Sequence, residues 1–234
     1  MDEPSREPRG TPDHHAMRLT PTPPFADEPA PLRKVRTLPG VRDDTALVEG
    51  LGAGEPWARA ALFERYAPQI ERMLRKILGP DQRTEIADVL HDVFVQALAS
   101  LDRLRDPRAV LSWMQAIAAH TAYRTIRARR ARRWLHFWAP DTLPEVVAPE
   151  IDDVVLDAYR RTYALLDRLP ADERVAFALR YIEGMELAQL AVVCDVSLAT
   201  IKRRLGRAEQ RFAAGARGDV ILRRWLEEGG RWTT

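Results

Sequence analysis

Apolar residues recur at helical spacing through most of this chain, and this periodicity limits the possible fold more than any other feature. Spacings of three and four residues place Leu62, Tyr66, Ile70, Leu74 and Ile77 on one stripe. No segment between residues 44 and 138 alternates apolar and polar residues as a half-buried strand would. The sequence therefore predicts an all-α protein.

The first half of the chain contains three helical segments. The stripe just described ends at Gly79-Pro80, and Pro68 inside it predicts a kink or a division into two helices. Thr84 is the expected cap of the next helix, whose apolar positions are Ile86, Val89, Leu90, Val93, Phe94, Ala97, Leu98 and Leu101. A third helix is expected from about Pro107 to about Arg133.

Composition divides the chain into segments. Nine prolines fall within residues 1–40, and this composition predicts a disordered extension over residues 1–41. Residues 139–152 carry three prolines and four acids, which indicates a flexible acidic linker. We therefore expect two small helical domains, at residues 42–138 and 153–214. A tail over 215–234 follows, in which Asp219–Glu228 predicts one short helix.

Charge is distributed unevenly along the chain. The formal net charge is +2 overall, but it is +4 over residues 42–138, −6 over 139–158 and +3 over 159–214. Two basic modules on either side of an acidic bridge are typical of a protein that binds a polyanion such as nucleic acid.

Several classes of protein are disfavoured. The longest stretch without a charged residue, Ala109–Tyr123, is too short and too polar to cross a bilayer. The beginning of the chain lacks the basic flank and apolar core of a secretory signal. Cys194 is the only cysteine, so no internal disulfide can form. We expect a cytoplasmic protein without a metal or other cofactor.

The segment from Glu186 to Ala208 predicts a helix-turn-helix, with the turn at Cys194–Val196 and Ser197 capping the second helix. The outward residues of that helix include Thr200, Lys202, Arg203, Arg204 and Arg207, and no acid occurs between Asp195 and Glu209. Such donors suit the base edges and phosphates of a DNA major groove. The alternative is an ordinary helical hairpin with a solvated basic face.

The third helix ends in a strongly basic segment. Six arginines fall within residues 124–133, and His120, Arg124 and Arg127 lie on one face because they are spaced by four and three. Trp134, Phe137 and Trp138 follow directly. Arginine grips phosphates and aromatic rings stack on unpaired bases, although these aromatics could equally pack against the core.

A polar face is expected opposite the apolar stripe of the second helix, formed by Asp88, His91, Asp92 and Gln96. A metal site could be imagined from Asp88, His91 and Asp92, but no further ligand is visible. We favour a surface that binds a partner protein.

At these three positions the sequence resembles the extracytoplasmic-function (ECF) sigma factors, which are promoter-recognition subunits of bacterial RNA polymerase. Asp88–Phe94 resembles the family's helix that docks on the polymerase clamp. Trp113–Arg130 resembles the helix that meets the −10 promoter element. The helix-turn-helix, together with the segment from Leu166 to Met185, resembles the region that reads the −35 element. The resemblance covers about 44–138 and 153–213.

The resemblance implies partners and roles for particular residues. The partners would be RNA polymerase core, promoter DNA and an anti-sigma factor. Contacts to polymerase would come from Asp88, His91, Asp92 and Gln96. Contacts to the −10 element would come from Asp102, Arg103, Arg105, Trp113, His120, Arg124, Arg127 and Arg130. Contacts to the −35 element would come from Ser197, Thr200, Lys202, Arg203, Arg204 and Arg207.

The sequence also departs from the family pattern. Ala119-His120 stands where Arg-Asn is frequent, Arg124 where Asp is frequent, Asp195 where Gly is usual, and Arg203 replaces a small residue. These departures keep open a second interpretation, a sigma-like DNA-binding regulator without strand-opening activity. A nucleic-acid-processing enzyme has little support, because the Asp88/Asp92 pair is the only carboxylate constellation and no nucleophile accompanies it. We expect no enzymatic activity.

Overall fold

The computed structural model describes residues 43–79, 82–135 and 153–227, and every regular element in these ranges is helical. The elements are α1 (Asp44–Gly52), α2 (Pro56–Leu78), α3 (Arg83–Ala99), η1 (Leu101–Arg103), η2 (Pro107–Ala109), α4 (Val110–Leu135), α5 (Asp153–Leu166), α6 (Ala171–Phe177), η3 (Ala178–Ile182), α7 (Leu187–Val193), α8 (Leu198–Arg217) and α9 (Val220–Glu227). The all-α prediction is confirmed. The expected extension 1–41 and the expected linker 139–152 lie outside the described residues.

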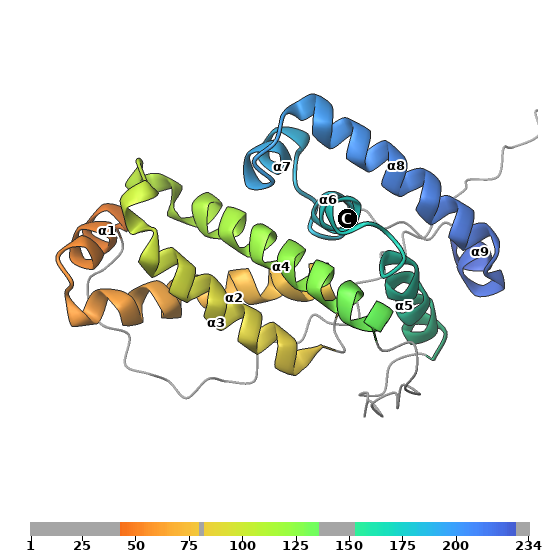
Figure 1. Cartoon of the computed structure of the whole chain (residues 1–234), viewed down its shortest axis with the longest axis horizontal. Coiled ribbons are helices and arrows are strands. Elements are labelled where there is room, and N and C mark those ends of the chain that lie inside the picture. Colours follow the sequence, from red (N-terminus) through yellow and green to blue (C-terminus); the bar gives the residue numbers. More distant parts are fainter. Residues whose placement is uncertain (1–42, 80–81, 136–152, 228–234) are drawn as a thin grey trace, which may run out of the picture.

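Helices α2, α3 and α4 pack against one another, and α1 lies against α2 and η2 (Figure 1). Their shared core contains Ile70, Leu74, Val93 and Met114, all fully buried. Pro68 neither breaks α2 nor divides it, because the helix runs unbroken from Pro56 to Leu78. Burial of apolar residues on both sides of the proline offsets the backbone hydrogen bond that proline cannot donate.

Two details of α3 differ from the sequence prediction. The helix begins at Arg83 with Gln82 as its N-terminal flanking residue, so Thr84 does not cap it. Leu98, expected on the buried stripe, is 39% exposed. Ala97 is the last position of this stripe that faces α2 and α4, and Leu98 lies about 100° further around the helix.

The second half of the chain forms a smaller helical assembly of α5 to α9. The rings of Phe177 and Phe212 stack with centroids 4.9 Å apart, and Leu222 of α9 is fully buried in the same cluster. Gly215 permits the close approach of α5 to α8, because a Cβ atom there would lie 2.7 Å from Cδ2 of Leu165.

The two halves pack against each other rather than standing apart. Helix α4 lies against α6 and α7 (Figure 1), and buried residues of both halves form one continuous apolar cluster. Ile77 and Ala118 represent the first half in this cluster, and Val175 and Leu179 the second. None of the described helices is long and apolar enough to span a lipid bilayer.

Candidate nucleic-acid interface

Helices α7 and α8 form a helix-turn-helix whose turn is fixed by local hydrogen bonds. Asp195 adopts a left-handed conformation, with φ of 50°, which a short polar side chain tolerates. The amide of Val196 donates to the carbonyl of Ala191 at 3.0 Å. Ser197 Oγ accepts from the amide of Thr200 at 3.2 Å and thereby caps α8. The predicted turn and cap are confirmed.

Helix α8 is strongly amphipathic. Ile201, Leu205 and Ala208 face the core and are buried. Lys202, Arg203 and Arg207 are exposed on the opposite side, and none of these three takes part in an ion pair with another described residue. These three cations are therefore free to meet an anionic ligand such as a DNA backbone.

Two other residues of the predicted −35 set are engaged within the protein. Arg204 is half-buried, and its Nε lies 3.2 Å from the carboxylate of Asp172 on α6. Thr200 Oγ1 lies 3.0 Å from Ser197 Oγ. Arg204 therefore holds α8 against α6, whereas the sequence prediction placed it outward with its neighbours.

The only cysteine lies at the end of α7, inside the turn. Burial raises the pKa of the Cys194 thiol to about 11, and the charge of nearby Arg204 opposes this shift. The thiol is therefore protonated at neutral pH and packs as a small apolar group.

The basic face of α4 contains an aromatic residue that the sequence interpretation missed. His120, Arg124 and Arg127, which were predicted to share one face, are all exposed. Tyr123 lies between them, with its ring centroid 6.4 Å from that of His120 and 5.7 Å from the Arg127 guanidinium carbon. Residues 120, 123 and 127 are spaced by three and four, so the helical period alone could have predicted that they lie together on one face. It offers an aromatic ring beside cations, which suits an unpaired base and its phosphate.

Other residues of the predicted −10 set are only partly exposed or already paired. Trp113 packs against the core and is half-buried. Arg130 is exposed, but its Nη1 donates to the carbonyl of Leu169, in the second half of the chain, at 3.3 Å. Its neighbour Arg129 pairs with Glu85 of α3. The side chain of Trp134 and residues 137 and 138 lie outside what the structure describes.

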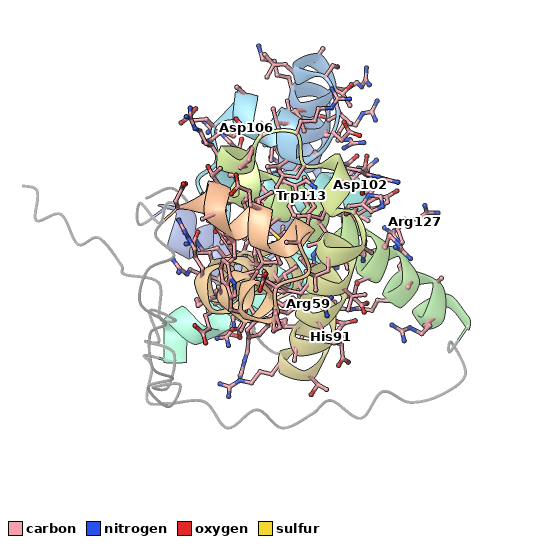
Figure 2. The ribbon with its side chains drawn as sticks, turned by 90° about the vertical axis from the view of Figure 1, so that its left-hand side faces the viewer. Arg59, His91, Asp102, Asp106, Trp113 and Arg127 are labelled. Atoms are coloured by element: carbon pink, nitrogen blue, oxygen red, sulfur yellow. The ribbon has the colours of Figure 1, made fainter. Side chains whose placement is uncertain are left out.

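The connector between α3 and α4 folds into η1 and η2. Asp102, Arg103 and Arg105 are exposed on it. Asp106 begins η2 by accepting a hydrogen bond from the amide of Arg108 at 2.9 Å. Figure 2 shows Asp102 and Asp106 at the same end of the bundle as Trp113.

A separate surface is presented by α3. Asp88, His91 and Asp92 are exposed there, whereas Gln96 is partly buried and donates to Thr121 Oγ1 of α4 at 3.2 Å. Figure 2 shows His91 apart from Arg127, which projects from α4. Within the described part of the chain, no three His, Cys, Asp or Glu side chains gather into a possible metal site.

The same surface carries apolar side chains that the sequence interpretation did not assign to it. Phe63 of α2, Val95 and Leu98 are each more than a third exposed, and the ring of Phe63 lies 4.9 Å from that of the buried Phe94. Exposed apolar side chains gathered on one surface are typical of a site that binds another protein.

Each half of the chain matches a family model. The model of Sigma-70 region 2 matches residues 62–139, and the model of Sigma-70 region 4 matches residues 159–212. The chain is 28% identical over 176 residues to the ECF RNA polymerase sigma-E factor of Haemophilus influenzae, an alignment that covers 71% of this chain and 92% of that relative. For the protein of the same description from Escherichia coli K12 the identity is 26%, with 71% and 91% covered.

The fold also has a counterpart among solved structures. The structure of CnrH in complex with the cytosolic domain of CnrY matches with a TM-score of 0.51 at 24% identity, over 75% of this chain and 98% of that chain. Because the two sigma models together match more than half of the chain and follow its two helical halves, the chain belongs to the ECF sigma factors.

Proposed function

We propose that this sigma factor binds the core of RNA polymerase and directs it to promoters, with region 4 reading the −35 element and region 2 engaging the −10 element. The observation that carries the proposal is the exposed cationic face of α8, formed by Lys202, Arg203 and Arg207 at the capped start of a helix-turn-helix. A helix N-terminus and its first turns are the part that enters a major groove in this motif.

The −10 element would be engaged by α4. Exposed His120, Arg124 and Arg127 supply hydrogen-bond donors, and Tyr123 supplies a ring on which an unpaired base can stack. The exposed connector residues Asp102, Arg103 and Arg105 would contribute from the other end of the helix. The departures from the family pattern at His120 and Arg124 fall within this cluster, so we expect an unusual −10 sequence.

The polymerase would be bound by the surface of α3. Asp88, His91 and Asp92 supply polar contacts, and Val95 and Leu98 supply apolar area beside them. Gln96, placed in this set by the sequence, instead connects α3 to α4 and would act by holding the surface in shape.

This role requires binding and no covalent chemistry, so we propose that the chain is not an enzyme. Its place of action would be the cytoplasm, where the polymerase lies. We also propose an anti-sigma factor as a regulator. Family membership supports this partner, and the related CnrH is known in complex with the cytosolic domain of CnrY.

The test is co-elution of the full chain with purified polymerase core in size-exclusion chromatography. We expect a stoichiometric complex, and we expect the double variant Asp88→Ala/Asp92→Ala to weaken it. Glu49→Ala is the control, because Glu49 is an exposed acid on α1, a helix that packs mainly against α2 and η2. Binding to promoter duplex without binding to polymerase would replace the proposal with a DNA-binding regulator that does not initiate transcription.

A further inference from the structure

A glycine stands near the middle of α8, and the packing of the protein does not explain it. Gly206 is partly exposed, and a glycine inside a helix is less stable there than an alanine. Its φ is not positive, so the backbone conformation does not require glycine. A Cβ atom at Gly206 would meet no other part of the described structure within 4 Å, whereas a Cβ atom at Gly215 would lie 2.7 Å from Leu165. The reason for Gly206 therefore lies outside the chain.

Gly206 is surrounded by the exposed cations of α8. Lys202 and Arg203 precede it by four and three residues, which makes them its neighbours on the helix surface, and Arg207 follows it directly. Successive residues turn by about 100° around a helix, so Gly206 points between the directions of Lys202 and Arg203. Arg203 points almost directly away from the buried Ile201 and Leu205.

A side chain at position 206 would fill the space between these two cations. Side chains on a helix lean toward its N-terminus and cover the preceding turn. At position 206 that turn is the one that carries Lys202 and Arg203. Glycine instead leaves a bare area of helix backbone between them, which we call the glycine slot.

The charges around the glycine slot favour an anion. Lys202, Arg203 and Arg207 make no ion pair with another described residue. The one acid in the sequence of α8 is Glu209, and its carboxylate accepts a hydrogen bond from Tyr181 Oη of η3. The cations beside the slot are therefore available to a ligand such as a phosphate.

The size of a recognition helix also brings the slot close to a DNA strand. A helix with its side chains is about 10–12 Å across, and the major groove of B-form DNA is about 12 Å wide. A helix in the groove therefore touches the walls, which are the two sugar–phosphate strands. A side chain that points directly into the groove meets base edges, and one that points to the side meets a wall. Gly206 lies about 60° to the side of Arg203, toward Lys202.

We propose that Gly206 opens a slot on α8 that receives a backbone phosphate of the −35 duplex. Lys202 neutralises this phosphate, and Arg203 extends past it to a base edge. The inference rests on the proposed function and specifies how α8 is seated in the groove. Gly206 thus lowers the stability of the helix but lets the DNA strand approach it closely.

The slot is tested by filling it in the full chain. Fluorescence anisotropy measures binding to a labelled duplex that the unaltered chain has selected from a random-sequence library. Gly206→Ala should weaken binding by about fivefold and Gly206→Leu by more, the scale of overpacking a close contact. Gly206→Ala should at the same time raise the midpoint of thermal unfolding by about 1–4 °C, because alanine favours the helix.

Opposite effects on stability and binding separate the slot from a folding defect. Ala213→Leu is the matched control, because Ala213 is exposed on the same side of α8 about two turns later, and its binding should not change. Equal binding by Gly206→Leu and the unaltered chain would overturn the inference.

The salt dependence identifies the group that occupies the slot. Lys202→Ala should lower the slope of log K against log salt concentration by about one, as loss of a phosphate contact does. Gly206→Leu should lower the slope by about the same amount, although it removes no charge. The double variant should lose no further unit, because both changes remove one contact. An unchanged slope in Gly206→Leu would overturn the assignment of a phosphate.

The outcomes also separate this inference from the proposed function. A chain that binds its selected duplex and shows these effects, but never initiates transcription with polymerase core, would keep the slot and refute the proposed function. Specific initiation by the unaltered chain, with no effect of Gly206→Leu on binding, would refute the slot alone. A chain that selects no duplex would overturn both.

Discussion

In the first half of α8, Lys202, Arg203 and Arg207 are exposed and unpaired among the described residues, whereas Arg204 forms an ion pair with Asp172 of α6. The first three are therefore candidates for reading DNA, and Arg204 is a candidate for positioning the helix. We predict that Arg203→Ala weakens binding to a −35 duplex by about 1–3 kcal/mol and relaxes sequence preference there, as loss of a base contact does. Arg217→Ala, on the last turn of the same helix, is the control. Fluorescence anisotropy measures both, and equal losses from the two variants would remove Arg203 from the reading face.

Arg204 should behave differently from Arg203. Its ion pair with Asp172 has side-chain exposures of 25% and 36%, so we expect a coupling free energy of about 0.2–1 kcal/mol. A double-mutant cycle of Arg204→Ala and Asp172→Ala, followed by denaturant unfolding, measures it. Asp172→Ala should also weaken DNA binding slightly, because it loosens α8. Additive effects on stability would show that the pair does not position the helix.

Cys194 provides a pH-dependent test of the turn. Its pKa, raised by burial from 9.0 to about 11, means that the folded state favours the thiol. This contribution to stability is complete below pH 9 and is lost as the pH rises through about 11. At pH 8 the native thiol should react with iodoacetamide roughly a hundredfold more slowly than in denaturant, because fewer thiolates are present. Equal rates would mean that the turn is open.

Among the elements, α9 lies beyond the residues matched to region 4, yet it belongs to that region's core. Asp219 accepts from the amides of Ile221 and Leu222 at the start of α9 and pairs with Arg161 of α5 at 3.0 Å. Leu222 is fully buried. The helix is thus built into region 4 and is not a passive tail.

We predict that Leu222→Ala lowers the free energy of unfolding by about 2–5 kcal/mol, the cost of a cavity in a packed core. Val220, two residues earlier and 67% exposed, provides the control, and Val220→Ala should change stability by less than about 0.5 kcal/mol. Guanidinium unfolding followed by far-ultraviolet circular dichroism measures both. A neutral Leu222→Ala would show that α9 does not hold region 4 together.

Local patterns predicted the elements that carry the proposed site. The sequence was sufficient to predict three features of α8 and its turn, because each depends on residues only a few positions apart. They are the Ser197 cap, the turn at Asp195 and the cationic stripe of α8. The helical period also predicted the core positions of α2 and, apart from Leu98, those within α3. The effect of Pro68 on α2 was harder to predict, because whether a proline breaks a helix depends on the packing around it.

Long-range contacts could not be predicted in the same way. Arg174 is a charged residue of α6, yet it is buried and donates to carbonyls of α2 that lie almost one hundred residues away. Gln96 and Arg204 were predicted to be exposed from the sequence pattern. In the structure Gln96 bonds to Thr121 and Arg204 pairs with Asp172, so both make contacts inside the protein. A short helix was expected over Asp219–Glu228, but nothing local indicated that region 4 would bury Leu222.

At the scale of the whole molecule, the two sigma regions lie in one closed body, with apolar residues from both in a single cluster. A flexible pair of modules was expected from the acidic segment between them, and that segment lies outside the described residues.

The measurement that tests the central claim most directly is reconstituted transcription with purified polymerase core and a library of promoter fragments. We predict initiation at defined start sites that requires this chain, depends on sequence at both elements, and falls strongly in the double variant Arg203→Ala/Arg207→Ala but not in Arg217→Ala. Absence of specific initiation by the unaltered chain, or initiation that is indifferent to the double variant, would contradict the assignment of α8 as the −35 reader of a sigma factor.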